Sequence, residues 1–372
     1  MKKMTLPIAI ALLTLLSACG TAPAEPEDSP ETPPVMNPTQ LPASTPRPSE
    51  TPAPSPTPTS PPTEREINPL SGLRMDESAY GRRPVAVMLN NIKAALPMYG
   101  QSRADIIYEV MAEGGITRML AIYQDPPDVP RIGSVRSTRS YYLDLAQGHD
   151  ALLLHAGASE MAYADIRTRG VDNFDGVNGP YEGTLYWRDK DRIRTVGLEH
   201  SMFTSGVRIR ELLASTKTRT ALREDFTLGW RFSENASIRN GDAARTVTIK
   251  FSSYKTGVFT YDAEKARYLV SQYGKPYVDG ETGGQVETDN VLGLFADIGL
   301  IRGDAYDRLY AKLVGEGDGF YANGGVSMPI RWSKESFQAP FVFTTADGEP
   351  LVMRPGQSYI NVIGLKTPVT LE

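Results

Sequence analysis

The sequence predicts an α+β protein, in which an N-terminal mixed α/β domain is followed by a mostly antiparallel β-rich domain. In the first half, residues 84–90 (PVAVMLN) and 151–155 (ALLLH) are short apolar runs of the kind that form buried strands. A helical pattern over residues 160–167 follows the second run. In the second half, runs such as residues 245–251 and 257–262 alternate polar and apolar positions, which is typical of half-buried antiparallel strands.

Length and composition predict two folded domains behind a leader and a linker. The chain has 372 residues, of which 40% are hydrophobic, so it exceeds one typical domain and can form ordinary cores. We expect a signal peptide over residues 1–19 and a disordered linker over residues 20–66. The N-terminal domain is expected over residues 67–225 and the C-terminal domain over residues 240–372.

Residues 1–19 have the features of a bacterial lipoprotein signal peptide. Lys2 and Lys3 form a positive start, residues 6–16 are apolar, and residues 16–19 (LSAC) resemble the lipobox. In a lipobox the thiol receives diacylglycerol, and cleavage leaves that cysteine at the mature N-terminus. The apolar run is too short for an ordinary spanning helix. We therefore expect a palmitate-type lipid anchor on Cys19 at the outer face of the cell membrane, the alternative being a secretory leader whose cysteine is incidental.

The segment after Cys19 is rich in proline, threonine, serine and glutamate. Such a segment cannot bury enough apolar surface to fold, so it is expected to be an extended spacer. Cys19 is the only cysteine of the chain, which excludes an internal disulfide.

Two β-rich runs, residues 104–112 and 116–124, flank a Gly-Gly turn and predict a hairpin. Alternation along the first run places Glu109 and Glu113 on one face, and Arg118 belongs to the second run. These three charged residues are candidates for an anion site or for a cross-strand ion pair.

An arginine pair is the most informative charge pattern of the first half. The pattern predicts a helix that starts at Gly133 and Ser134 and stops at Gly148, which places Arg136 and Arg139 on one face of its opening turns. Cations there oppose the positive end of the helix dipole, at a cost of roughly 0.3 to 1 kcal/mol each, unless a negative group is near. The negative group could be a carboxylate of the fold, namely Asp144, Glu109 or Glu113, or it could be an anionic ligand.

Two further positions complete the candidate ligand-binding residues, which are Ser134, Arg136, Arg139, His155, Glu109, Glu113 and Arg118. His155 ends a predicted strand in a small-residue turn before a helix, an arrangement that exposes backbone N–H groups to an anion. It could equally be a hydrogen-bonded structural histidine. Asn90 and Asn91 end another predicted strand and are either site groups or turn residues.

Several motifs in order resemble one known family. The segments RPVAVMLNN, ADIIYEVMAEGGITRMLAIYQ, RIGSVRSTRSYYLDLA, HAG, GEGDG and PGQSYINVI look like those of the YerB-like bacterial lipoproteins. That family consists of tethered proteins of Gram-positive-type bacteria with two consecutive domains of unknown function. The resemblance covers residues 67–372 and implies a family and a location, but no catalytic residues.

Two classes of function remain open. The first is a membrane-anchored extracytoplasmic lipoprotein that binds an anionic envelope ligand, such as a cell-wall polymer, or an envelope protein. The alternative is an envelope hydrolase or phosphoryl-group transferase, with the arginines as charge stabilisers and Glu109, Glu113, His155 or His200 as acid or base. No catalytic residue is assigned, and we expect no cofactor and no metal, because the histidines share no ligand spacing. The net charge of −5 argues against nucleic acid as a partner.

Overall fold

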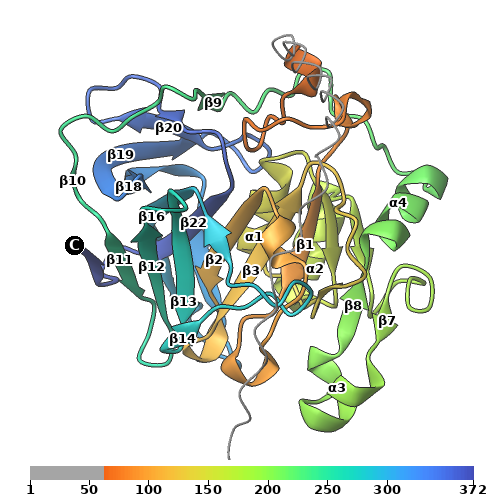
Figure 1. Cartoon of the computed structure of the whole chain (residues 1–372). Helices are drawn as coiled ribbons and strands as arrows, with labels where there is room; N and C mark the ends of the chain where they lie inside the picture. Colours follow the sequence, from red (N-terminus) through yellow and green to blue (C-terminus); the bar gives the residue numbers. More distant parts are fainter. Residues whose placement is uncertain (1–62) are drawn as a thin grey trace, which may run out of the picture. The chain divides into compact units, whose positions relative to one another are not determined.

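The computed structural model describes residues 63–372 (Figure 1). The predicted signal peptide, Cys19 and the predicted linker up to residue 62 lie outside the described residues. The last residues assigned to the linker, Glu64–Glu66, form a short 3-10 helix, η1. Within residues 63–372, none of the helices combines the length and hydropathy that crossing a membrane requires.

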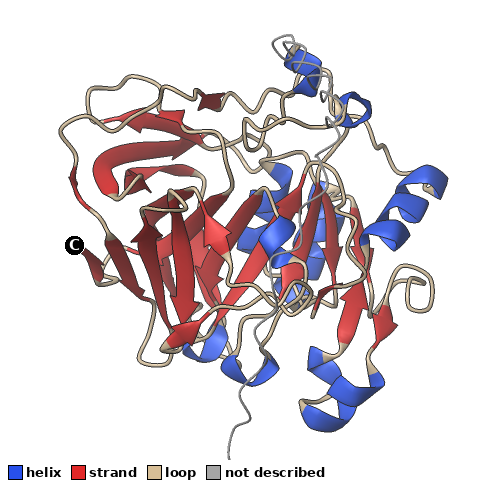
Figure 2. Ribbon diagram, in the orientation of Figure 1, coloured by secondary structure: helices blue, strands red, loops and turns tan. Residues whose placement is uncertain are grey.

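The centre of the fold is a mixed sheet of 12 strands (Figures 1 and 2). Ten strands follow one another across it, and β17 and β20 pair with β16 and β19 off this path. In spatial order the ten are β10 (Asp242–Ala243), β19 (Val326–Lys334), β18 (Gly315–Asn323), β16 (Asn290–Leu300), β22 (Ser358–Gly364), β2 (Ile106–Met111), β3 (Thr117–Tyr123), β1 (Val85–Leu89), β5 (Leu152–His155) and β6 (Asn173–Asp175). The two additional strands are β17 (Leu309–Lys312) and β20 (Val342–Thr345).

The strands predicted in the first half form at the expected places. β1 is buried along its whole length, and its residues alternate between two hydrophobic clusters, with Val85 and Val87 in one and Ala86 and Met88 in the other. A strand covered on both faces needs apolar residues at every position, which explains the unbroken run. β1 pairs antiparallel with β3 and parallel with β5, and β5 pairs parallel with β6.

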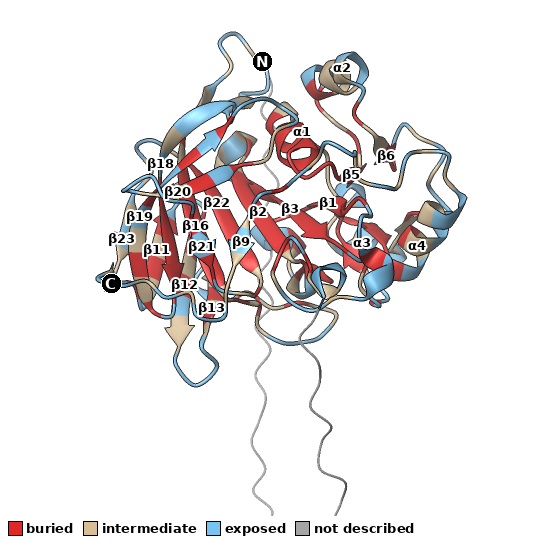
Figure 3. Cartoon of the chain, turned by 90° about the horizontal axis from the view of Figure 1, so that it is seen from above, coloured by how far each residue is buried: buried red, intermediate tan, exposed pale blue. Residues whose placement is uncertain are grey.

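Residues 63–372 contain four α-helices, all before residue 216: α1 (Ser140–Gln147), α2 (Glu160–Arg169), α3 (Lys190–Thr195) and α4 (Gly206–Ser215). Figure 3 shows α1 buried, whereas α2 and α4 keep exposed outer faces. At the start of α4 the Ser205 side chain caps the helix by accepting a hydrogen bond from the Arg208 backbone N–H. Short 3-10 helices connect other elements, namely η2 (Glu77–Ala79), η3 (Lys93–Ala95), η4 (Gln101–Arg103), η5 (Glu113–Gly115) and η6 (Leu198–His200).

The start predicted for α1 is wrong. The helix begins at Ser140 with Arg139 at its N-cap, so Arg136 lies outside it. The preceding residues are extended instead, because β4 (Ile132–Gly133) pairs with β8 (Met202–Thr204). A strand partner that is remote in sequence therefore overrides the local helical pattern.

The antiparallel pattern predicted for the second half is confirmed. A six-stranded antiparallel sheet comprises β14 (Lys275–Pro276), β13 (Arg267–Gln272), β12 (Thr256–Asp262), β11 (Thr246–Lys250), β23 (Val369–Leu371) and β15 (Glu287–Thr288). Its inward residues, including Val247, Ile249 and Phe259, join the same core cluster as Val85 and Val87 of the main sheet. Two small sheets complete the fold, one of β4, β7 (Trp187–Arg188) and β8, the other of β9 (Arg231–Phe232) and β21 (Val352–Met353).

Strand β22 joins the two halves of the sequence. It lies between β16 and β2 and pairs parallel with both. The main sheet therefore contains strands from both sides of residues 226–239, the stretch between the two predicted domains. The predicted domain limits stay a prediction, but strands from both segments share one sheet. The overall α+β class, with its β-rich C-terminal half, is as predicted.

His149 is a buried base that makes the stability of this fold depend on pH. It follows α1, is 3% exposed, and its Nε2 lies 2.8 Å from the Tyr108 hydroxyl. Burial, assisted by the positive charge of Lys334, lowers the pKa of His149 from 6.5 to about 3. The unfolded chain therefore binds a proton near pH 6.5 that the folded chain rejects, so stability falls as the pH falls through 6.5.

We predict that His149→Gln reduces this acid sensitivity. At about pH 5 the histidine lowers the free energy of unfolding by about 2 kcal/mol relative to about pH 7.5, and the variant lacks this loss. Urea denaturation at both pH values measures the difference, and other titrating groups cancel between variant and parent. Tyr108→Phe removes the same hydrogen bond but keeps the imidazole, so it should retain the parental pH dependence. Equal acid sensitivity in His149→Gln would contradict the prediction.

Candidate functional site

An extended segment, residues 135–138, lies between the carboxyl ends of the parallel strands β1 and β5. The Arg136 N–H donates to Met88 O at 3.0 Å, and Ala156 N–H donates to Arg136 O at 3.1 Å. The Thr138 N–H donates to Gly157 O, also at 3.0 Å. The segment thus continues the sheet beyond the strand ends, which is the edge where α/β sheets commonly place ligands.

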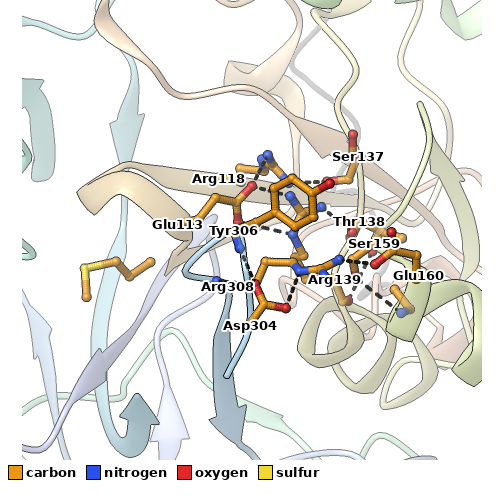
Figure 4. Close-up of polar contacts among 12 residues, drawn as sticks. Glu113, Arg118, Ser137, Thr138, Arg139, Ser159, Glu160, Asp304, Tyr306 and Arg308 are labelled. Atoms are coloured by element: carbon orange, nitrogen blue, oxygen red, sulfur yellow. Dashed lines mark hydrogen bonds and ion pairs between the residues drawn. The ribbon is translucent and has the colours of Figure 1, made fainter. Parts of the chain in front are cut away.

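Glu113 forms ion pairs with two of the arginines near this segment (Figure 4). Its Oε1 accepts from Arg118 Nη2 at 2.9 Å, and its Oε2 accepts from Arg139 Nε at 3.2 Å. Arg139 Nη2 also contacts Oε1, and Arg118 Nη1 donates to Ser137 O at 3.0 Å. The positive charges of the two arginines hold the pKa of Glu113 below its ordinary value against the opposing effect of burial. Arg118 and Arg139 are therefore both paired within the fold.

Arg136 differs from both neighbours. Its Nη1 donates to the backbone oxygen of Glu199 at 2.7 Å, and within residues 63–372 no carboxylate forms an ion pair with it. Its Nε is buried and has no hydrogen-bond partner. Burial, then the positive charges of Arg118 and Arg139, lower the pKa of Arg136 to about 10, so it remains a cation at neutral pH.

A cleft of about 360 Å³ opens beside Arg136. We call it the Arg136 cleft, and its polar lining residues are Arg136, Ser137, Tyr163, Asn178, Arg188 and Glu199. The lining also includes the small residues 156–158 (AGA), the turn that follows β5. Asp175 holds this turn, since its carboxylate accepts from the Gly157 N–H at 2.8 Å and from the Tyr163 hydroxyl at 2.6 Å. The second cation, Arg188, is partly balanced by Glu182 at 3.4 Å.

Ser134 and His155 are structural rather than cleft residues. Ser134 O accepts from the Asn90 N–H at 3.0 Å, and its Oγ accepts from Asn90 Nδ2 at 3.3 Å. His155 is fully buried, with Nδ1 2.8 Å from Gly157 O and Nε2 3.0 Å from Asn173 Oδ1. His155 therefore contacts the turn at residues 156–158 through Gly157 O, and neither side chain lines the cleft among the described residues.

Glu109 does not share a face with Glu113, contrary to the prediction. Strand β2 ends at Met111, and Glu113 begins the 3-10 turn η5, so strand alternation does not reach it. Glu109 instead points into a buried cluster with Asn91, Thr117 and Lys255. The predicted carboxylate pair is therefore two separate sites.

The sequence did not point to several residues of the Arg136 cleft and of the cluster around Glu109. Asn178 and Arg188 belong to an irregular stretch in which no periodicity fixes the direction of side chains. Lys255 is a buried lysine in a polar turn, and its sequence neighbourhood gives no signal of burial. Asn91 could be suspected from its place after a buried strand. Among the described residues, no group of three or more His, Cys, Asp or Glu side chains could hold a metal ion.

Fold and site together define an α+β protein with a cationic cleft at the end of a mixed sheet. The chain belongs to the family described as protein of unknown function (DUF3048), whose N-terminal domain matches residues 70–220 and whose C-terminal domain matches residues 247–360. It is 30% identical over 302 residues to the "Putative lipoprotein YerB" of Bacillus subtilis strain 168, covering 79% of this chain and 85% of that protein. The resemblance predicted from the sequence is thereby confirmed.

A solved structure agrees with this assignment. A crystal structure of the YerB protein from Bacillus subtilis matches with a TM-score of 0.70 and 28% sequence identity. The match covers 82% of this chain and 99% of that chain. The fold is therefore shared along nearly the whole of that solved chain.

We predict that Glu113→Gln destabilises the protein by about 3 kcal/mol, because it leaves the buried Arg118 without its counter-ion. The side chain of Arg118 is 4% exposed, so water cannot replace the carboxylate. Glu316→Gln is the matched control, since Glu316 pairs with Arg331 on the surface and its loss should cost less than about 1 kcal/mol. Urea denaturation of both variants tests this, and equal small losses would show that Glu113 is not needed for charge balance.

Proposed function

We propose that this chain is a membrane-anchored extracytoplasmic lipoprotein whose folded part binds an anionic envelope ligand in the Arg136 cleft. The observation that carries the proposal is the state of Arg136. It is a half-buried guanidinium with an unpartnered Nε and, within residues 63–372, no carboxylate partner. Leaving a buried charge without a counter-ion is costly, and an anionic ligand would remove that cost.

The chemistry of the cleft suits a phosphate or carboxylate group. A guanidinium presents its N–H donors in a planar fork that matches two oxygens of either group. Arg188, the Ser137 and Tyr163 hydroxyls and the Asn178 amide supply further polar contacts around the same cavity. Glu113 already pairs with Arg118 and Arg139, and Glu199, which also lines the cleft, contacts Arg136 through its backbone oxygen, so within residues 63–372 Arg136 has no carboxylate in an ion pair with it.

The proposed location rests on the leader and on the relative. Residues 16–19 resemble a lipobox, and the relative from Bacillus subtilis has a name that describes a lipoprotein. Lipid on Cys19 would place the folded part outside the membrane of a bacterium of Gram-positive type. Envelope polymers there bear phosphate or carboxylate groups, and we favour such a polymer or its lipid-linked precursor over a partner protein.

The structure gives no specific support to the enzyme alternative. Its candidate acids and bases were Glu109, Glu113, His155 and His200. Among the described residues, none of these four lines the Arg136 cleft. His200 instead contacts the Asn90 amide at 2.8 Å and is 5% exposed.

We predict that inorganic phosphate stabilises the folded chain and that Arg136→Gln abolishes the effect. At a concentration ten times the dissociation constant, a single site adds about 1.4 kcal/mol to the free energy of unfolding. Thermal denaturation over a phosphate series at constant ionic strength measures it.

The matched control is Arg331→Gln, which makes the same charge change at a surface arginine that pairs with Glu316 and Asp318. It should respond to phosphate as the parent does. Without phosphate, Arg136→Gln should be as stable as the parent or more so, because it relieves repulsion from Arg118 and Arg139. If phosphate stabilises Arg136→Gln as much as the parent, the cleft is not the anion site.

We predict that Cys19→Ala abolishes membrane attachment without changing the folded part. Cys19 is the only cysteine and the proposed lipid acceptor, so no second thiol can replace it. In a bacterial host that processes lipoproteins, the parent should partition into the detergent phase and the variant should not. Metabolic labelling with a fatty acid provides an independent readout. A variant that still partitions and labels like the parent would refute the anchor.

A further inference from the structure

Glu109 holds an amine and a carboxamide on the same oxygen atom. Its Oε1 lies 2.9 Å from Lys255 Nζ and accepts from Asn91 Nδ2, also at 2.9 Å. Thr117 Oγ1 donates to the same oxygen at 2.6 Å and accepts from Asn91 Nδ2 at 2.8 Å. The other oxygen, Oε2, accepts from the Tyr359 hydroxyl at 2.5 Å. The lysine amine and the asparagine amide are therefore no more than two hydrogen-bond lengths apart.

The cluster is sealed from solvent. Asn91 is 0% exposed, and both Glu109 and Lys255 are 1% exposed. Phe251 and Tyr273 place their rings within 6 Å of Lys255 Nζ, at 5.9 and 5.3 Å. Burial lowers the pKa of Lys255, against the opposing effect of Glu109, and so favours the neutral, nucleophilic amine.

Two polar atoms of the cluster lack hydrogen bonds, and the ion pair between Lys255 and Glu109 does not account for either of them. Asn91 Oδ1 and Gln272 Nε2 are both buried, and neither atom has a hydrogen-bond partner within residues 63–372. Gln272 contacts Lys255 through its Oε1, but Glu109 accepts the amide of Asn91 rather than that of Gln272. The carboxylate thus links Lys255 to Asn91 specifically.

We propose that Lys255 and Asn91 become joined by an intramolecular isopeptide bond, with Glu109 as the proton carrier. A lysine amine, a carboxamide and a buried carboxyl group that can accept the proton of the amine together supply every component that amide exchange needs. The surrounding apolar residues exclude the water that would compete as a nucleophile.

The reaction balances within the cluster. Glu109 takes a proton from the Lys255 ammonium, and the free Nζ attacks Cγ of Asn91. Rotation of the amide brings Oδ1 to Thr117 and the protonated Glu109, which then polarise the carbonyl group. The Nζ–Cγ bond forms and the Cγ–Nδ2 bond breaks. Nδ2 gains both protons that Nζ loses and departs as ammonium, so Glu109 ends as the carboxylate with which it began.

The product fits the position that the reactants occupy. The new amide N–H would replace the Asn91 amide as donor to Glu109 Oε1, since Nζ already lies at that oxygen. The bond would connect the end of β1 to the turn between β11 and β12, and so join the two halves of the sequence. The bond would form whether or not the Arg136 cleft holds a ligand.

Peptide mapping of the full chain tests the proposal directly. Trypsin releases residues 83–93, which contain Asn91, and cleaves after Lys250 and Lys265, on either side of Lys255. The expected result is residues 83–93 linked to residues 251–265, with no cleavage after Lys255 and a mass deficit of one ammonia. Cleavage after Lys255 with both peptides free would overturn the proposal. A link to Gln272 or to Glu109 would overturn the assignment of Asn91.

Two variants separate the roles. Lys255→Arg keeps the positive charge but removes the amine, and Glu109→Gln keeps the shape but removes the proton carrier. Each should lose the linked peptide completely, with circular dichroism reporting that the chain remains folded. If Glu109→Gln still forms the link, Glu109 is not the proton carrier. The peptide map of the parent chain shows by itself whether the bond between Lys255 and Asn91 exists, so this measurement does not depend on whether either variant folds.

Discussion

Charge balance around Glu113 is the constraint on which the candidate site depends. Three guanidinium groups lie near one carboxylate, and burial makes each of them expensive to leave unpaired. Glu113 reaches Arg118 and Arg139 because it stands in the turn after β2, beyond the strand that would otherwise fix its direction. Arg136 is left with a backbone oxygen only. The position of Glu113 in the turn after β2 thus determines that Arg136, which lines the cleft, is the arginine without an ion pair among residues 63–372.

The β2–β3 hairpin distributes polar chemistry to two faces of the sheet. Glu109 stands opposite Met119 in the register, and Arg118 stands opposite Val110. Paired residues of neighbouring strands point to the same face, and successive residues point to opposite faces. One face therefore receives the carboxylate that meets Lys255, and the other receives the arginine that meets Glu113. The hairpin therefore separates the buried cluster of Glu109 and Lys255 from the ion pairs of Glu113 beside the Arg136 cleft.

The sequence allowed prediction of those parts of the fold that depend on local pattern. The hairpin and the buried strand β1 follow from the periodicity of apolar residues and from the Gly-Gly turn, which are properties of neighbouring residues. The start of α1 could not be predicted, because β8 holds the preceding segment extended. The sequence singles out Arg136 and Arg139, but only the position of Glu113 decides which of them is already paired. Lys255 could not be found, since nothing near it in the sequence indicates that it is buried.

The cluster around Glu109 can assemble only after the last long strand of the chain is in place. Tyr359, on β22, closes the second oxygen of the carboxylate, and β22 itself needs β2 and β16 as partners on its two sides. In the unfolded chain Lys255 and Asn91 are far apart, and water hydrates both the amine and the carboxyl group. Proximity and desolvation, the two conditions that favour amide exchange, therefore arise together on folding. Since Cys19 cannot form an internal disulfide, such a bond would be a covalent link that forms only in the completed fold and needs no second cysteine.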